Sequence, residues 1–237
     1  MVRIGIVGIG FMGWAHFAGA TKISEKGKIS GSKLKGAAVT TVCSRNLEKL
    51  IGDWTSIQGN FGPPGPMLDL AKINAYDKFN EMIVDPNIDL VDICLPNDRH
   101  EEAVIMALEA GKHVLVEKPI AIDPKAADRM VAAAKKTGRI LMVAQVLPFF
   151  PEFKFAAEAI ASGKYGKLRA AHFRRVISPP KWSGRHVRLS QTGRLGDRSA
   201  HSRQPLHQPR VRSSSTSFLT WNFGRGIREP CSHPVPL

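Results

Sequence analysis

No apolar run in the 237 residues approaches the roughly 20 residues that a membrane-spanning helix requires. The first eight residues also lack the long apolar segment and the small-residue cleavage site of a secretory signal peptide. These absences predict a chain with no membrane partner, and they make the cytoplasm its expected location. Global disorder is excluded as well, because 43% of the residues are hydrophobic, which is enough to form a buried core.

Cysteine is scarce, and this limits metal and disulfide sites. The three cysteines, Cys43, Cys94 and Cys231, show neither the spacing of a metal site nor that of a disulfide framework. We therefore predict no metal. Cys43 and Cys94 fall in apolar stretches typical of strands, where a buried free thiol is expected.

Acidic residues are few relative to basic ones, and the net charge of +14 raises the question of a nucleic-acid partner. Residues 1–184 carry 25 Lys and Arg against 18 acidic residues, a net charge of +7. Residues 185–237 contribute the other +7 with nine Arg, two acidic residues and no Lys. This segment lacks the interleaved aromatic residues of a base-stacking platform, so we predict no specific nucleic-acid binding.

Strand and helix patterns alternate over the first 145 residues. Apolar and β-branched runs predict strands at residues 2–7, 38–43, 73–76, 89–95, 113–116 and 140–144. Helical patterns predict helices at residues 11–20, 46–51, 77–84, 99–110 and 124–137. Residues 21–35 are expected to extend the first helix or form a loop, and residues 58–66 to form a loop. The alternation predicts an α/β fold, a doubly wound parallel sheet of the Rossmann type, in residues 1–145.

A different pattern begins after this domain. It predicts a helix at residues 151–162 with one apolar face, a turn at 163–166 and a strand at 168–177. We interpret residues 146–184 as the incomplete beginning of an α+β substrate domain.

From residue 185 the apolar residues lose their periodicity. Residues 185–237 are an irregular basic tail rich in Arg, Ser and Pro. Two explanations stay open: a natural disordered tail, or a segment translated out of frame, which the abrupt change of composition between Gly184 and Arg185 favours.

The first predicted strand runs into Gly8-Ile9-Gly10-Phe11-Met12-Gly13, a GxGxxG motif that opens a helix. In such a motif Gly8 allows a tight turn, Gly10 lets the backbone approach a pyrophosphate, and Gly13 lets the helix pack closely on the strand. Backbone N–H groups and the helix dipole both favour phosphate at this helix N-terminus. We therefore predict a nicotinamide dinucleotide site that uses all six residues; the alternative is that the glycines serve only a tight turn.

The residues after the second predicted strand bear on cofactor choice. An Asp or Glu at this point usually binds the ribose 2′-hydroxyl of NAD, but this chain has Cys43-Ser44-Arg45. The hydroxyl of Ser44 and the guanidinium of Arg45 suit a 2′-phosphate. The sequence thus predicts NADP, with NAD still possible. The alternative is that Ser44 caps a helix and Arg45 is solvated.

Polar residues also follow later strands, at the edge of a parallel sheet where ligands bind. Pro96, Asn97 and His100 follow the fourth predicted strand, Glu117-Lys118-Pro119 follows the fifth, and Gln145 follows the sixth. Together with the glycine loop, these motifs resemble the glucose–fructose oxidoreductase, inositol dehydrogenase and rhizopine-catabolism (Gfo/Idh/MocA) family of NAD(P)-dependent oxidoreductases. The resemblance covers roughly residues 1–180.

The resemblance implies hydride transfer between a nicotinamide and a carbon of a sugar, polyol or related substrate. Lys118 would be the catalytic residue, because an ammonium stabilises negative charge on the reacting oxygen and can move its proton. Glu117 and Pro119 would set the loop that carries this lysine. The resemblance places Pro96, Asn97, His100, Glu117 and Gln145 beside the cofactor; the alternative for His100 is a helix-start residue that caps the helix or faces solvent.

The chain departs from the family after Gly184. The resemblance implies a helix with a catalytic Asp and His, but no histidine of residues 185–237 lies in the helical Asp-x-x-x-His setting that it implies. We therefore expect an oxidoreductase whose turnover is impaired; the alternative function is a non-catalytic dinucleotide-binding or redox-sensing module. The homo-oligomer of the intact family, which the missing domain would form, is in doubt here.

Overall fold

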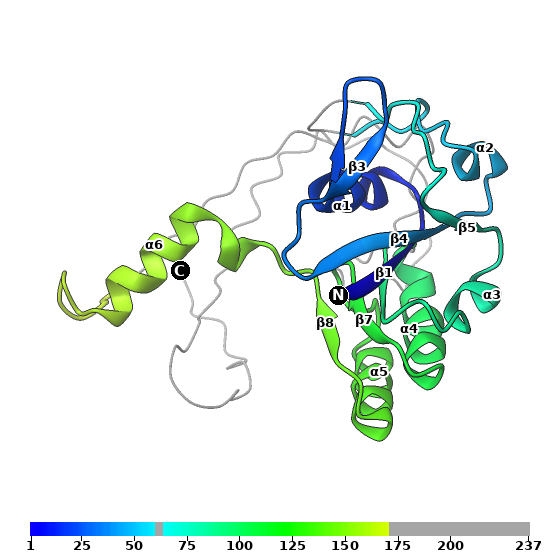
Figure 1. The fold of residues 1–237 in the computed structure, drawn as a ribbon. Coiled ribbons are helices and arrows are strands. Elements are labelled where there is room, and N and C mark those ends of the chain that lie inside the picture. The colour runs from blue at the N-terminus through cyan, green and yellow to red at the C-terminus, as the bar shows by residue number, and fades with distance from the viewer. Residues whose placement is uncertain (60–63, 171–237) are drawn as a thin grey trace, which may run out of the picture. The chain divides into compact units, whose positions relative to one another are not determined.

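A parallel sheet is the centre of the computed structural model, which describes residues 1–59 and 64–170 (Figure 1). Its six strands lie in the spatial order β5-β4-β1-β6-β7-β8, and every neighbouring pair is parallel. This is the strand order of a doubly wound sheet, and it confirms the predicted α/β fold. In chain order the strands are β1 (Val2–Val7), β4 (Ala37–Cys43), β5 (Asn74–Tyr76), β6 (Leu90–Ile93), β7 (His113–Val116) and β8 (Leu141–Val143).

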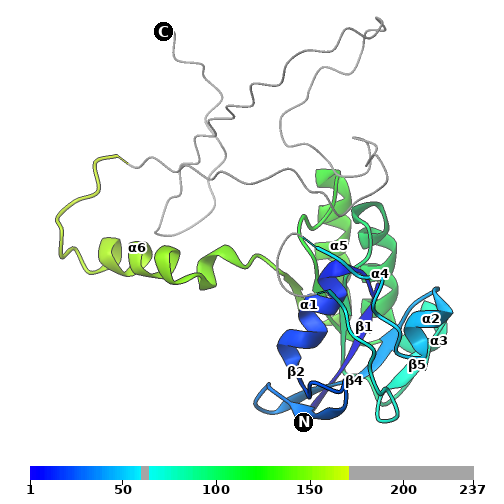
Figure 2. The same cartoon turned by 90° about the horizontal axis from the view of Figure 1, so that it is seen from above.

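The two faces of the sheet carry separate hydrophobic cores. Successive side chains of a strand point to opposite faces, so Ile6 is buried with α1 (Phe11–Ala20), whereas Val7 is buried with α4 (His100–Glu109). Figure 2 shows α1 and α4 on opposite sides of β1. The core on the α4 side also receives side chains from α3 (Phe79–Ile83) and α5 (Pro124–Thr137). Helices from the start and from the end of the predicted strand–helix alternation thus pack on the sheet, α1 on one face and α5 on the other.

Local signals explain the ends of the helices. The side chain of Asp123 accepts the N–H of Lys125 at the start of α5, and Gly138 ends that helix in the left-handed conformation. The short α2 (Leu47–Leu50) begins in the same way, because the side chain of Asn46 accepts the N–H of Glu48. These boundaries match the predicted helices.

Residues 21–35 differ from the prediction of a helix extension or a loop. They form an antiparallel hairpin of β2 (Thr21–Ile23) and β3 (Ile29–Ser32). Gly27, at φ +74°, makes the turn, and its N–H donates to the carbonyl of Ser24. Ile29 is buried against the core on the α1 side, and this gives the hairpin its place on the domain. The run of Lys and Gly in this segment concealed the short strands.

The remaining predictions fall partly outside the described residues. The predicted helix at 151–162 is present as α6 (Pro151–Ala161). Residues 168–170 have no regular structure, and the rest of the strand predicted there, Cys231 and the tail from residue 185 lie outside the described part of the chain. Within residues 1–59 and 64–170, no helix is both long enough and apolar enough to cross a bilayer.

Candidate dinucleotide-binding and catalytic site

The glycine loop between β1 and α1 is set by backbone contacts with its neighbours. Gly8 has φ +90°, and a Cβ at this position would lie 2.6 Å from the carbonyl oxygen of Cys94. A Cβ on Gly13 would lie 2.3 Å from the carbonyl oxygen of Gly8. A Cβ on Gly10 would meet nothing within 4 Å. Two of the glycines are therefore required by the fold, whereas the third leaves open space above the backbone.

The start of α1 lies directly behind this open space. Gly10 is the N-cap residue, and no side chain caps the helix; its first turn carries no acidic residue. The partial positive charge of the helix N-terminus therefore faces the loop without a carboxylate of its own first turn. Lys49, from α2, donates to the carbonyl of Ile9 at 2.5 Å. Sequence reasoning missed this lysine, which holds the loop from the side.

Ser44 and Arg45 follow β4, as the sequence predicts, at the same edge of the sheet. Ser44 donates its N–H to the carbonyl of Tyr76, and its hydroxyl accepts the N–H of Asn46. Arg45 is exposed. The N-cap of α2 is Asn46 rather than Ser44. The exposed guanidinium is compatible with a 2′-phosphate and with solvation alike.

The ends of β6 and β7 bring the next group of predicted residues together. Pro96 and Asn97 follow β6, where Asn97 begins a 3₁₀ turn (Asn97–Arg99) that leads into α4. Lys118 follows β7 and is exposed, and the Lys118–Pro119 peptide bond is cis. Because β6 and β7 are parallel neighbours, both loops lie at the carboxyl edge of the sheet.

His100 lies beneath these two loops and not on their surface. Its side chain is fully buried, with Nδ1 2.9 Å from the carbonyl oxygen of Pro119 and Nε2 3.0 Å from that of Leu95. The prediction of a direct cofactor contact for His100 is therefore corrected, and so is the alternative of a solvent-facing residue. The imidazole joins the loop after β6 to the loop after β7.

Residues 2–145 match the Gfo/Idh/MocA family model, described as an oxidoreductase family with an NAD-binding Rossmann fold. The chain belongs to this family. An oxidoreductase of Rhizobium meliloti without an assigned function is 32% identical over 76% of this chain and 48% of its own length. An inositol 2-dehydrogenase/D-chiro-inositol 3-dehydrogenase of Lactiplantibacillus plantarum is 30% identical over 70% of this chain and 42% of its own length.

Solved structures of the Gfo/Idh/MocA type are similar over the same region. A probable dehydrogenase from Thermotoga maritima is 28% identical, with a TM-score of 0.54, over 68% of this chain and 41% of its own. The chain thus spans about half the length, or somewhat less, of the curated relatives it matches. The family resemblance inferred from the motifs is confirmed.

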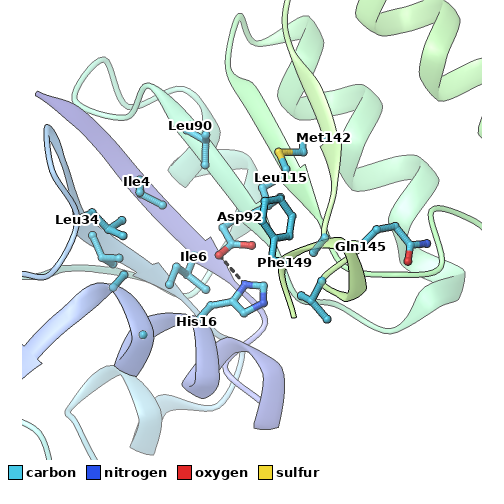
Figure 3. A pocket seen from close by; sticks show the side chains of 15 residues that line it. Ile4, Ile6, His16, Leu34, Leu90, Asp92, Leu115, Met142, Gln145 and Phe149 are labelled. Carbon is cyan, nitrogen blue, oxygen red and sulfur yellow. Dashed lines mark hydrogen bonds and ion pairs between the residues drawn. The ribbon is translucent and has the colours of Figure 1, made fainter. Parts of the chain in front are cut away.

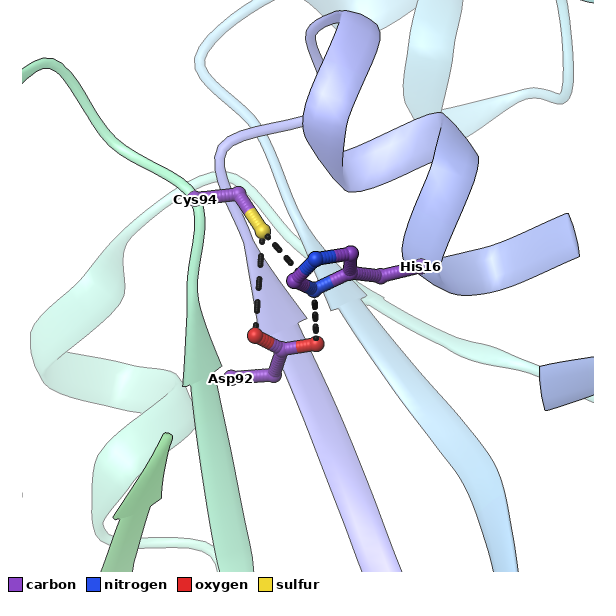
Figure 4. Close-up of side chains that lie close together, drawn as sticks. All are labelled: His16, Asp92 and Cys94. Atoms are coloured by element: carbon purple, nitrogen blue, oxygen red, sulfur yellow. Dashed lines mark hydrogen bonds and ion pairs between the residues drawn. The ribbon is translucent and has the colours of Figure 1, made fainter. Parts of the chain in front are cut away.

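A buried polar cluster lies behind the Gfo/Idh/MocA motifs, and sequence reasoning missed it (Figure 4). His16, on α1, has Nδ1 2.9 Å from Oδ2 of Asp92, as Figure 4 shows. Its Nε2 lies 3.1 Å from Oε1 of Glu117, which the figure does not draw. The thiol of Cys94 lies 3.4 Å from Nδ1 and donates to Oδ1 of Asp92 at 3.7 Å. Glu117 is buried, and its Oε2 accepts the N–H of Lys118 at 3.0 Å. Glu117 thus holds the lysine loop from within the domain.

The cluster perturbs the protonation of its members. Burial alone would lower the pKa of His16, but its hydrogen bonds to Asp92, Cys94 and Glu117 outweigh burial and raise that pKa to about 12. Burial would raise the pKa of Glu117, but the hydrogen bond from the imidazole and its charge lower it below the usual range. Burial raises the pKa of the Cys94 thiol to about 11. These shifts favour a protonated imidazole, an ionised Glu117 and a neutral thiol in the cluster.

The same three residues, His16, Asp92 and Cys94, offer one nitrogen, one oxygen and one sulfur within 4.8 Å of one another. Such a set is of a kind that binds transition metals. Here the donor atoms are already paired with one another at hydrogen-bond distances. The hydrogen-bonded arrangement accounts for the cluster as it stands.

An open groove of about 360 Å³ extends from this cluster along the α1 side of the sheet (Figure 3). Its floor consists of apolar side chains of four adjacent strands: Ile4, Leu90, Leu115 and Met142. His16 and Asp92 line the groove between Ile6 and Phe149, and Gln145 lines it as well (Figure 3). Gln145 is exposed after β8, as its predicted place at the sheet edge requires. Half of the surface of Met142 is accessible, so this part of the sheet has an uncovered apolar face.

Proposed function

We propose that residues 1–145 bind a nicotinamide dinucleotide, with its pyrophosphate against residues 8–13 and the N-terminus of α1. The observation that carries this proposal is the uneven space around the three glycines. Gly8 and Gly13 are crowded by backbone, whereas Gly10 has open space where a phosphate could approach its N–H. Membership in a family described as NAD-binding supports the same conclusion.

The variant Gly10→Ala would test the proposed phosphate site. Gly10 has φ −104° and ψ −158°, which alanine adopts freely, so the fold should be unchanged. The added methyl group would occupy the space of the phosphate, and we expect NADH binding, followed by nicotinamide fluorescence, to weaken at least about tenfold. Gly19→Ala, farther along α1, is the matched control and should bind as the wild type does. Unchanged affinity in Gly10→Ala would refute the phosphate site.

For the choice of cofactor we propose NADP over NAD. The support is the exposed Arg45, which follows β4 where an acidic residue would favour NAD. Arg45→Asp should weaken NADPH binding about 10- to 100-fold, the range expected for the loss of a charged hydrogen bond, and should leave NADH binding equal or tighter. NADH titrated into the same variant is the internal control. Equal losses for both cofactors would assign Arg45 no part in selecting the 2′-phosphate.

We further propose that the complete site transfers hydride to or from a sugar or polyol. Inositol, the substrate in the name of one relative, is a polyol. When bound, the nicotinamide would donate or accept the hydride. Lys118, exposed at the end of β7, would donate its proton to the carbonyl oxygen during reduction. Pro96 and Asn97 would border the cofactor from the next loop, and Gln145 from the end of β8. We propose residues 146–184 as the start of the substrate domain.

A further inference from the structure

We propose that His16 is a positioning residue for Lys118: its charged imidazole bridges two buried carboxylates and so fixes the loop that presents the lysine. This inference deepens the proposed function and rests on it for its catalytic meaning. It adds a link between the helix that begins at the glycine loop and the strand end that carries the lysine.

With both carboxyl groups ionised, the geometry requires a proton on each nitrogen of the ring. Both ring nitrogens of His16 lie at hydrogen-bond distance from carboxylate oxygens, 2.9 Å for Asp92 and 3.1 Å for Glu117. An ionised carboxylate only accepts hydrogen bonds, so both nitrogens must donate, which only the imidazolium can do. The side chains of His16, Asp92 and Glu117 are only 18%, 6% and 7% exposed, so water screens their charges weakly.

Three elements contribute the groups of the cluster. The β6 segment contributes Asp92 and the neutral thiol of Cys94, the β7 end contributes Glu117, and α1 contributes the imidazole itself. Lys118 adds a cation next to Glu117 and helps to lower the pKa of that carboxyl group. A neutral His16 would leave one buried carboxylate facing a nitrogen lone pair, which is strongly unfavourable.

Glu117 transmits the position of His16 to the lysine. One oxygen of its carboxylate accepts from the imidazole, and the other accepts the backbone N–H of Lys118 at 3.0 Å. The N–H of Glu117 itself donates to the carbonyl of Ile93, which ties the same residue to β6. Without the imidazolium, the carboxylate would lose one of its two anchors and the peptide of Lys118 would lose its fixed acceptor.

Two measurements on the full chain without cofactor test the proposal. In the wild type at pH 8, the ¹⁵N NMR signals of the His16 ring should show a proton on both nitrogens. In His16→Gln, amide hydrogen exchange at Lys118 should be about five- to tenfold faster, the equivalent of about one lost hydrogen bond. His113→Gln, which changes a histidine of β7 outside the cluster, should leave exchange at Lys118 unchanged.

Either measurement can overturn the inference. A neutral ring at pH 8 would refute the bridge, and this requires no variant to fold. Unchanged exchange at Lys118 in folded His16→Gln would refute the transmission through Glu117. Stoichiometric zinc in the purified protein, with Nδ1 deprotonated and bound to the metal, would replace the ion-pair bridge by a metal site. Because no readout involves NADH, a failed dinucleotide titration would count against the proposed function and not against the bridge.

Discussion

Single side chains hold together the loops at the carboxyl edge of the sheet. His100 joins the loops after β6 and β7 through two carbonyl oxygens, and Lys49 holds the carbonyl of Ile9 in the glycine loop. His16 connects α1 to Glu117 and Asp92. Except for the contact of His100 with Leu95, these partners are 19 to 101 residues apart in the sequence. The edge of the sheet is therefore organised by the half-buried Lys49 and by imidazoles as well as by backbone.

The perturbed His16 predicts a pH dependence of stability. Its pKa is about 12 in the folded protein against 6.5 as the ordinary value, so the folded state keeps a proton that the unfolded state releases. The stabilisation is complete below about pH 6.5 and is lost as the pH rises toward 12. Between pH 7.5 and 9.5 we expect the wild type to lose up to about 1.4 kcal/mol per pH unit more than His16→Gln, measured by urea unfolding. Parallel curves for the two proteins would contradict the shift.

At the scale of elements, α1 connects the cofactor loop to the core. Phe17 and Trp14 of this helix pack edge to face against Trp54, which is fully buried. Gly13 brings the first turn of the helix against the loop, with its Cβ position 2.3 Å from the carbonyl oxygen of Gly8. Gly19 lies in the last part of the same helix, and a Cβ there would meet nothing within 4 Å.

These two glycines should respond to alanine with opposite signs. Gly13→Ala forces a methyl group against backbone, and we expect a loss of about 1–3 kcal/mol in the free energy of unfolding. Gly19→Ala removes backbone entropy from the unfolded chain without a clash, and we expect a gain of about 0.5–1 kcal/mol. Urea or thermal denaturation of both variants beside the wild type measures the difference. A destabilised Gly19→Ala would show that the end of α1 is more crowded than its surroundings indicate.

Elements with regular patterns could be predicted from the sequence, and those that depend on distant contacts could not. Helix α5 has both a capping Asp123 and a terminal Gly138, so its bounds were predictable. The hairpin of β2 and β3 was missed because three- and four-residue strands show no usable periodicity. The motif residues could be assigned correctly to the carboxyl edge of the sheet, because the carboxyl ends of parallel strands lie at the same edge. His16 carries no such signal, because its partners lie 76 and 101 residues away in the chain.

At the scale of the whole molecule, the described domain corresponds to only part of the longer relatives. The family model matches residues 2–145, and the groove along β1, β6, β7 and β8 leaves apolar side chains uncovered. Within the Rossmann domain, Lys118 is the residue that we propose for proton transfer. Asp197 and His201 have the Asp-x-x-x-His spacing, but they fall in a stretch whose apolar residues show no helical periodicity, and they lie outside the described residues.

We therefore expect the 237-residue chain to bind the dinucleotide but to turn over little or no substrate. NADPH or NADH should bind to the purified protein, whereas oxidation of myo-inositol and related polyols, followed at 340 nm, should be at or near the background rate. A Lys118→Ala variant should give the same background rate and similar cofactor affinity. Robust oxidation of any polyol in the panel, abolished in Lys118→Ala, would show that this chain carries a complete active site.

The unequal surroundings of the three loop glycines also bear on how such a chain diverges over time. Replacement of Gly8 or Gly13 would damage the domain whether or not a ligand binds, so these positions are under constraint from folding alone. Gly10 is under no such constraint, and a lineage that no longer used the dinucleotide would be free to exchange it. Of the three, Gly10 is therefore the position at which the proposed phosphate site alone would act as a constraint.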